Sequence, residues 1–136
     1  MLIIGERINA TRKSIGRALR RRDAEALERE ARAQAEAGAD FIDVNAASDP
    51  SRELENLKWA LQVVQQSTEL PICLDSADPD VLRAGLQLTS ADRVMLNSAT
   101  AEEGKMQEVM ALAADAGALL VALAMDDKGV PGTADR

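Results

Sequence analysis

Short hydrophobic runs alternate along the chain with longer stretches in which apolar residues recur every three or four positions. Runs of the first kind are typical of buried strands, and the longer periodicity is typical of amphipathic helices. The pattern predicts strands over residues 2–8, 41–45, 71–75, 94–97 and 119–125, with a helix between each consecutive pair. Strands and helices that alternate in this way indicate an α/β domain with a parallel sheet.

Capping residues mark the ends of the predicted helices. We expect the N-caps to be Asp23, Asp49, Asp78 and Thr100, with Pro50 and Pro79 at first helical positions, Glu103 completing a capping box with Thr100, and Gly38 and Gly117 ending two of the helices. The side chains expected to face the core are Ala24, Leu27, Ala31, Ala35, Leu54, Leu57, Leu61, Val64, Val81, Leu82, Leu86, Leu88, Met106, Met110 and Ala113. The residues after 125 are expected to form a loop.

Two architectures accommodate five parallel strands. A doubly wound open sheet is complete at 136 residues, whereas a (β/α)₈ barrel needs about 250 residues. Length therefore favours the open sheet. The polar residues at the strand ends favour the barrel, because the ends of all barrel strands converge on one mouth and an open sheet needs polar ends only near its switch point.

Every predicted strand finishes in a carboxylate or a carboxamide. These residues are Asn9 on the first strand, Asp43 and Asn45 on the second, Asp75 on the third, Asn97 on the fourth and Asp126 on the fifth. Carboxylates accept hydrogen bonds from N–H groups, and carboxamides both donate and accept them. We therefore expect a site for a flat, polar heterocycle, with Asp75 and Asn97 as its main contacts. The alternative is that single Asp and Asn residues cap a helix or stabilise a turn.

Composition narrows the classes of function. The formal net charge is −7 and only 1% of residues are aromatic, which disfavours a nucleic-acid-binding surface. The chain contains no His, so imidazole acid–base chemistry and His-ligated metals are excluded, and no metal site is expected. The single Cys73 and the lack of a long apolar run or a signal peptide indicate a cytoplasmic protein that does not cross a membrane.

Taken together, five motifs resemble those of methyltetrahydrofolate–corrinoid/iron–sulfur protein methyltransferases, within the wider pterin-binding superfamily that includes dihydropteroate synthase. The motifs are Gly-Glu-Arg-Ile-Asn at residues 5–9, Asp-Val-Asn at 43–45, Cys-Leu-Asp-Ser at 73–76, Asn-Ser at 97–98 and Lys-Gly-Val-Pro at 128–131. The resemblance runs over the whole chain in order. It implies a TIM barrel whose mouth binds methyltetrahydrofolate and passes the N5 methyl group to the cobalt of a corrinoid (cobalamin) carried by a partner protein.

The resemblance also implies roles for individual residues. Asp75 and Asn97 match the aspartate and the asparagine that hold the pterin ring, and Asn9, Asp43 and Asn45 line the same mouth. Another pterin-binding Asp and the Asn that contacts N5 belong to barrel strands six to eight, so the catalytic residues are expected in a C-terminal half. The chain is thus predicted to be the first five strands and four helices of a (β/α)₈ barrel: a single pterin-binding domain over residues 1–136, apparently truncated.

A half-barrel of this kind is expected to expose its apolar inner face and two strand edges. We therefore expect a homo-oligomer or a complementing half-barrel chain, and no methyl transfer by this chain alone. Two alternative functions are a dihydropteroate synthase and a non-catalytic module that binds pterins or assembles. The first strand ends in Glu-Arg-Ile-Asn and lacks the Asn-x-Thr-x-Asp-Ser-Phe loop of dihydropteroate synthases, which counts against that alternative.

Six basic residues crowd the segment after the first strand: Arg12, Lys13, Arg17, Arg20, Arg21 and Arg22. The simpler interpretation is a solvated loop and helix start. The alternative is a patch that attracts a polyanionic tail, such as the glutamates of a folate.

Overall fold

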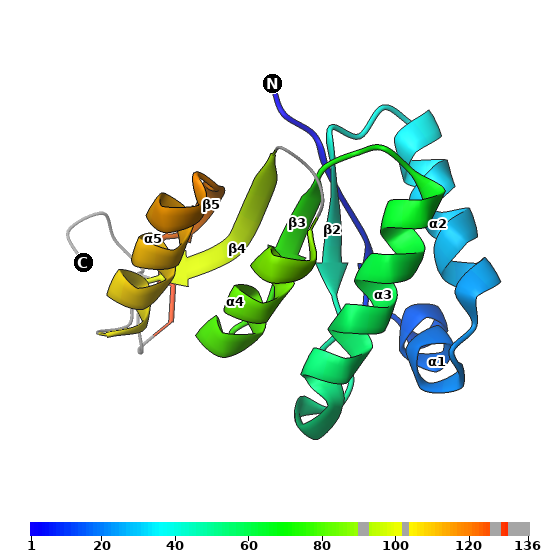
Figure 1. Cartoon of the computed structure of the whole chain (residues 1–136), viewed down its shortest axis with the longest axis horizontal. Coiled ribbons are helices and arrows are strands. Elements are labelled where there is room, and N and C mark those ends of the chain that lie inside the picture. The colour runs from blue at the N-terminus through cyan, green and yellow to red at the C-terminus, as the bar shows by residue number, and fades with distance from the viewer. Residues whose placement is uncertain (90–92, 102–103, 126–128, 131–136) are drawn as a thin grey trace.

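Strands and helices alternate along the chain in a computed structural model that describes residues 1–89, 93–101, 104–125 and 129–130 (Figure 1). The strands are β1 (Ile4–Asn9), β2 (Phe41–Asn45), β3 (Ile72–Asp75), β4 (Val94–Thr100) and β5 (Leu119–Leu123). The helices are α1 (Lys13–Arg21), α2 (Ala24–Glu36), the short 3₁₀-helix η1 (Pro50–Arg52), α3 (Glu53–Ser67), α4 (Pro79–Leu88) and α5 (Lys105–Ala116). The five predicted strands and the α/β class are confirmed.

The order of the strands distinguishes the two architectures. Each strand pairs in parallel with the next one along the chain, in the order β1-β2-β3-β4-β5. A flavodoxin-like open sheet would instead place the first strand between the second and the third. Sequential parallel neighbours joined by helices are the arrangement of a (β/α) barrel, so the described part of the chain is a partial barrel of this type.

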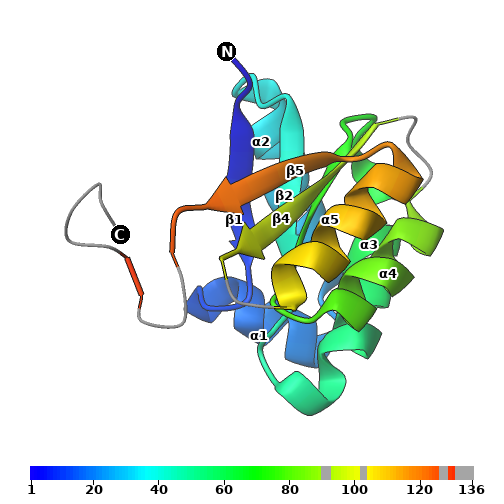
Figure 2. The ribbon, with the colours of Figure 1, turned by 90° about the vertical axis from the view of Figure 1, so that its left-hand side faces the viewer.

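Helices α2 to α5 cover one face of the sheet (Figure 2). Alternate strand residues point to this face, among them Val44, Leu74 and Leu96, which are register partners and are fully buried. They pack against Leu27 of α2 and Leu61 of α3 in the main hydrophobic core. In β2 and β3 the residues that point to the other face, such as Phe41 and Cys73, are buried as well, which accounts for the continuous apolar runs of these strands.

The opposite, concave face holds a smaller cluster of Phe41, Cys73 and Met95. These three side chains are at most 5% exposed, although no described helix covers them. The guanidinium of Arg93 lies 5.2 Å from the centre of the Phe41 ring and adds to the cover. The expectation that the inner face is exposed is therefore wrong at its centre, because the curved sheet and neighbouring side chains close over it.

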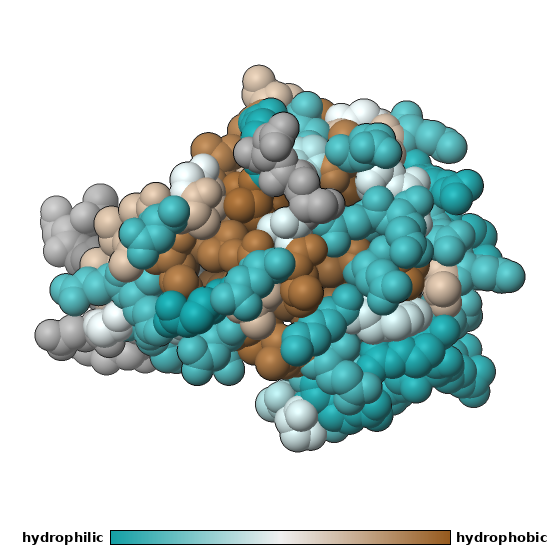
Figure 3. Space-filling model, in the orientation of Figure 1, coloured by the Kyte–Doolittle hydropathy of each residue, from teal (hydrophilic) through white to brown (hydrophobic). Residues whose placement is uncertain are grey.

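The edge of the sheet at β5 is different. Leu119 and Leu123 are each 41% exposed, so apolar surface remains on this strand as expected. Figure 3 shows further apolar residues at the surface in the middle of the view of Figure 1, between the polar surfaces of the flanking helices.

The sequence-based interpretation of the basic segment is wrong, because this segment forms helix α1. The basic segment was expected to be a loop and a helix start, but residues 13–21 form a nine-residue helix of their own. Its buried face consists of Ile15, Gly16, Ala18 and Leu19. This apolar stripe is short and is interrupted by arginines, so the periodicity does not stand out in the sequence.

Three of the four predicted N-caps are confirmed. The carboxylates of Asp23, Asp49 and Asp78 accept hydrogen bonds from backbone N–H groups of the following turns at 3.1, 3.0 and 2.9 Å. The Asp49 cap begins η1, and α3 follows it directly. The fourth is wrong: Thr100 belongs to β4, and Gly104 is the N-cap of α5. Its proposed partner, Glu103, lies outside the described residues.

Four predicted core residues are also wrong. Leu54, Leu88, Met106 and Met110 are 38–51% exposed. In α5 the buried side chains are Val109, Leu112 and Ala113. This helix is apolar on most sides, so its composition does not fix which face turns inward. No helix in the described ranges is long and apolar enough to cross a membrane.

Candidate functional site

The polar strand ends form one continuous row. Asn9 is the register partner of Asn45, Asn45 is the partner of Asp75, and Asp75 is the partner of Asn97. Register partners on neighbouring strands point to the same face, about 4.8 Å apart. The structure therefore brings four of the predicted site residues together, at the C-terminal ends of β1 to β3 and in the middle of β4. The prediction that the fourth strand ends at Asn97 is wrong, because β4 continues to Thr100. We call these four residues the polar row.

Asp43 lies one layer deeper on the same concave face, two residues before Asn45 on β2. Its register partner on β3 is Cys73, whose own partner on β4 is Met95. The Asp43 side chain is 1% exposed, and its Oδ1 atom has no hydrogen-bond partner among the described residues. A buried carboxylate thus forms the floor beneath the polar row.

Two hydrogen bonds join the amides to the carboxylates. Asn45 Nδ2 donates to Asp75 Oδ2 at 3.0 Å, and Asn97 Nδ2 donates to Asp43 Oδ2 at 3.1 Å. The second bond links β4 to β2 across the intervening β3. In a flat sheet those strands lie about 10 Å apart. The hydrogen bond between them therefore indicates that this face of the sheet is concave. Both carboxamides are held in one orientation as a result.

Asn9 is used differently from the other members of the row. Its Oδ1 atom accepts hydrogen bonds from the backbone N–H and the hydroxyl of Thr11, at 3.0 and 2.7 Å. The side-chain oxygen is thus committed to the turn between β1 and α1. This is the turn-stabilising role that short polar side chains often have.

Burial and like charges raise the pKa values of the carboxylates. Burial raises the pKa of Asp43 to about 6; the charges of Asp75 and Glu6 add to the increase, and the hydrogen bond from Asn97 opposes it. The pKa of Asp75 is raised by burial and by Glu6, and is lowered by the bond from Asn45. Burial beside Asp43 also raises the pKa of the Cys73 thiol, so the thiol is neutral and not a nucleophile.

Glu6 is a site residue that the sequence-based prediction missed. It lies in the irregular part of β1, between the paired residues Gly5 and Ile8, and its charge acts on Asp43, Asp75 and Cys73. The acidic residue of the Gly-Glu-Arg-Ile-Asn motif at residues 5–9 was the available signal. The direction of the Glu6 side chain could not be predicted, because the alternation of side chains along β1 does not continue through the bulge.

A pocket extends the site from Asp75 toward β5. Its lining consists of Asp75, Ser76, Ala77, Ser98, Thr100, Lys105, Val109, Leu123 and Met125. Of the polar row only Asp75 lines this pocket. Asp126 and Asp127, the predicted polar end of the fifth strand, lie outside the described residues, as do Lys128 and Pro131. Within the described ranges no three His, Cys, Asp or Glu side chains form a group that could hold a metal ion.

This arrangement suits a planar ligand with N–H donors. The Asp75 carboxylate uses Oδ2 for Asn45. Adjacent Asn97 has its N–H₂ group turned toward Asp43, which leaves its oxygen as an acceptor. A carboxylate beside a carboxamide oxygen accepts hydrogen bonds from neighbouring ring N–H and exocyclic NH₂ groups, and the ionic partner makes those bonds strong.

Comparison with known proteins identifies the family. Residues 5–136 match the family described as pterin binding enzyme. The chain is 39% identical over its whole length to methylcorrinoid:tetrahydrofolate methyltransferase from Eubacterium limosum, and it spans about half (51%) of that protein. It is also 32% identical to methionine synthase from Mycobacterium tuberculosis and 30% identical to that from Mycobacterium leprae, over 12% of each. On the strength of the family match, which covers nearly all of the chain, this protein belongs to the pterin-binding enzymes.

Proposed function

We propose that the chain binds methyltetrahydrofolate through the polar row and takes part in transferring its N5 methyl group to the cobalt of a corrinoid carried by a partner protein. The observation that carries the proposal is the pairing of Asp75 and Asn97, two acceptor-bearing side chains in register at the end of β3 and in the middle of β4. The corrinoid is a second substrate in this reaction.

The chemistry assigned to the described residues is binding and orientation. Asp75 accepts hydrogen bonds from the N–H groups of the pyrimidine half of the pterin, and Asn97 accepts a further one. Asp43 holds the Asn97 carboxamide in place, and Asn45 holds the Asp75 carboxylate. Both acceptors are fixed before the ligand arrives, so the protein loses little further conformational freedom when the ring binds.

Relatives support methyl transfer over the alternatives. The Eubacterium limosum protein is named for transfer between a methylcorrinoid and tetrahydrofolate, which is the same pair of partners in the opposite direction. One site serves both directions, because the forward and reverse reactions pass through the same transition state. A homo-oligomer or a complementing chain that covers the β5 edge is part of the proposal, and the exposed Leu119 and Leu123 support it.

The test is a calorimetric titration of the protein with methyltetrahydrofolate, comparing wild type with Asp75→Asn. This change keeps the shape of the side chain and removes the charge, so we expect the affinity to fall by roughly 10- to 100-fold. Asp80→Asn is the matched control. Asp80 is an exposed carboxylate at the start of α4, paired on the surface with Arg83. Equal loss in both variants, or no loss in Asp75→Asn, refutes the assignment.

A further inference from the structure

Helix α1 carries an exposed stripe of positive charge. Lys13, Arg17, Arg20 and Arg21 are all exposed, and their spacing of four, three and one residues places them along one side of the helix. The opposite side of the helix is buried. We call these four residues the basic stripe. It extends from Lys13 to Arg21, over nine residues, and its first and last members are separated by about 12 Å along the helix.

The basic stripe has no compensating charges. In the part of the chain that the structure describes, none of its four side chains forms an ion pair. No acidic residue occurs in the first turn of α1 either. Like charges three or four residues apart repel one another along a helix, and of the four only Arg20 and Arg21, in the last turn, gain from the helix dipole. This concentration of cations on one helix contrasts with the net charge of −7 of the chain.

Arg22, the next residue, differs from the basic stripe because its side chain is held by contacts within the fold. It forms an ion pair with Glu55, and its guanidinium lies 5.1 Å from the centre of the Trp59 ring. Both partners belong to α3. Arg22 therefore anchors the end of α1, while the basic stripe stays available to a ligand.

The position of α1 places the basic stripe at the edge of the site. The helix follows β1 after a three-residue turn and lies at the C-terminal end of that strand (Figure 2). In this turn Ala10 N donates to Asn45 O at 3.0 Å, which ties the turn to the polar row. A Cβ atom on Gly16 would lie 2.7 Å from Ala10 O, so the helix packs on the turn as closely as a glycine permits.

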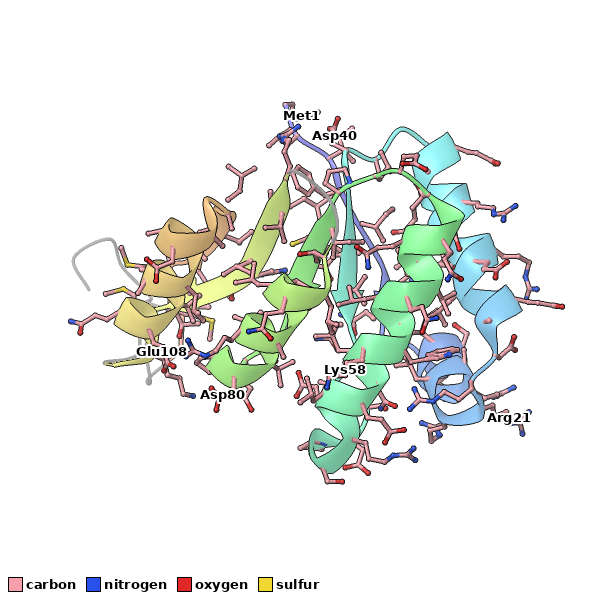
Figure 4. All side chains as sticks on the ribbon, in the orientation of Figure 1. Met1, Arg21, Asp40, Lys58, Asp80 and Glu108 are labelled. Atoms are coloured by element: carbon pink, nitrogen blue, oxygen red, sulfur yellow. The ribbon has the colours of Figure 1, made fainter. Side chains whose placement is uncertain are left out.

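The other side of the same edge carries charges of both signs, with Lys105 in the pocket beside Asp75 and Arg83 paired with Asp80. Asp78 and Asp80 begin α4, and Glu53 at the start of α3 accepts a hydrogen bond from Ser76. Figure 4 shows Arg21 and Asp80 at the same end of the molecule, on opposite sides of it. A negatively charged extension of a ligand bound at the polar row is attracted by the unpaired cations on the α1 side, whereas on the α4 side Asp80 is already paired with Arg83.

We infer that the basic stripe binds the carboxylates of an oligo-γ-glutamate tail on the folate. This inference rests on the proposed function, since it assumes that the pterin ring occupies the polar row. A glutamate tail supplies several carboxylates in succession, and the 12 Å stripe is long enough to meet more than one of them. Arginine guanidinium groups bind carboxylates through two parallel hydrogen bonds, which favours this ligand over a single point anion.

The experiment is a titration of the protein with methyltetrahydrofolate in its monoglutamate and pentaglutamate forms. We expect the pentaglutamate form to bind roughly tenfold more tightly at low salt, from several weak surface pairs acting together. The advantage should shrink as the salt concentration rises, because exposed charges are screened. In the double variant Arg17→Gln/Arg21→Gln the advantage should disappear, while the affinity for the monoglutamate form stays that of the wild type.

The matched control is Arg29→Gln/Arg32→Gln, which removes the same charge from exposed positions of α2. This variant should retain the pentaglutamate advantage. Equal affinity of the wild type for both forms, or an equal loss in the two double variants, overturns the inference and leaves the proposed function intact. Failure of both forms to bind to the wild type overturns the proposed function, and the inference with it.

Discussion

Asp43 combines deep burial, an unpartnered oxygen and a hydrogen bond to Asn97 on a strand that is not its neighbour. The Asp43 side chain holds the Asn97 amide in place, so Asp43 acts on a ligand through Asn97. Its pKa of about 6 means that the folded protein takes up a proton here under mildly acidic conditions. Asp75, closer to the surface and held by Asn45, is the carboxylate that meets the ligand directly in our proposal.

The raised pKa of Asp43 predicts how stability depends on pH. In the unfolded chain an aspartate titrates near 3.9, so between about pH 4 and 6 the folded state holds a proton that the unfolded state has released. The contribution of this group to stability is thus present below pH 4 and is lost as the pH rises through 6. Between pH 5 and 8 the loss is about 1.4 kcal/mol.

Asp43→Asn should remove this dependence, because the amide does not titrate in this range. Urea unfolding at pH 5 and pH 8 measures the effect as the change in free energy of unfolding for each protein. We expect the variant to be stabilised relative to wild type at pH 8 by about 1.4 kcal/mol more than at pH 5. The same change in stability between the two pH values in both proteins would contradict the raised pKa.

At the scale of elements, the sequence predicts the strands and several helix starts well, and the reasons are local. The run at residues 41–45 and the Asp78-Pro79 start of α4 each carry their signal within a few residues. The missed features depend on distant contacts. Helix α1 is stabilised by its packing on the turn after β1, and the bond between Asn97 and Asp43 depends on the curvature of the whole sheet.

The same limit applies to the candidate site. Asp75 and Asn97 could be predicted as neighbours, because strands that follow one another in a barrel are paired. The participation of Glu6 could not, because it requires the position of the bulge in β1. The outward position of Met106 and Met110 likewise follows from how α5 packs on β4, which composition does not reveal.

Close packing of α1 on the end of β1 gives a prediction at this scale. Gly16→Ala places a methyl group 2.7 Å from Ala10 O, a backbone atom that yields little. Overpacking of this kind costs about 1–3 kcal/mol, against a gain of about 0.5–1 kcal/mol from the better helix propensity of alanine. We expect a net loss of about 1 kcal/mol in the free energy of unfolding, together with weaker pterin binding.

Ser14→Ala is the control for this substitution, since Ser14 is an exposed position in the first turn of the same helix. Chemical denaturation should show Ser14→Ala within about 0.5 kcal/mol of wild type. A Gly16→Ala protein as stable as Ser14→Ala would show that α1 moves away from the turn at no cost.

For the whole molecule, the partial barrel formed by the described residues leads to a prediction about turnover. In our proposal the described part of the chain supplies the groups that bind the pterin ring, whereas the resemblance assigns the contact with N5 to barrel strands six to eight. We therefore expect the 136-residue chain alone to bind methyltetrahydrofolate and to leave cob(I)alamin unmethylated. The absorbance of cob(I)alamin follows the reaction directly, and its loss in step with the formation of tetrahydrofolate would contradict this prediction.

The contact between Arg22 and Trp59 makes the fluorescence of Trp59 sensitive to the position of α1. Trp59 is the single tryptophan, the chain has no tyrosine, and the guanidinium that lies over the indole belongs to the end of α1. Detachment of α1 from α3 therefore changes the surroundings of the one fluorophore that dominates the emission. Any binding event that shifts α1 relative to α3 is therefore expected to change the emission of the unlabelled protein.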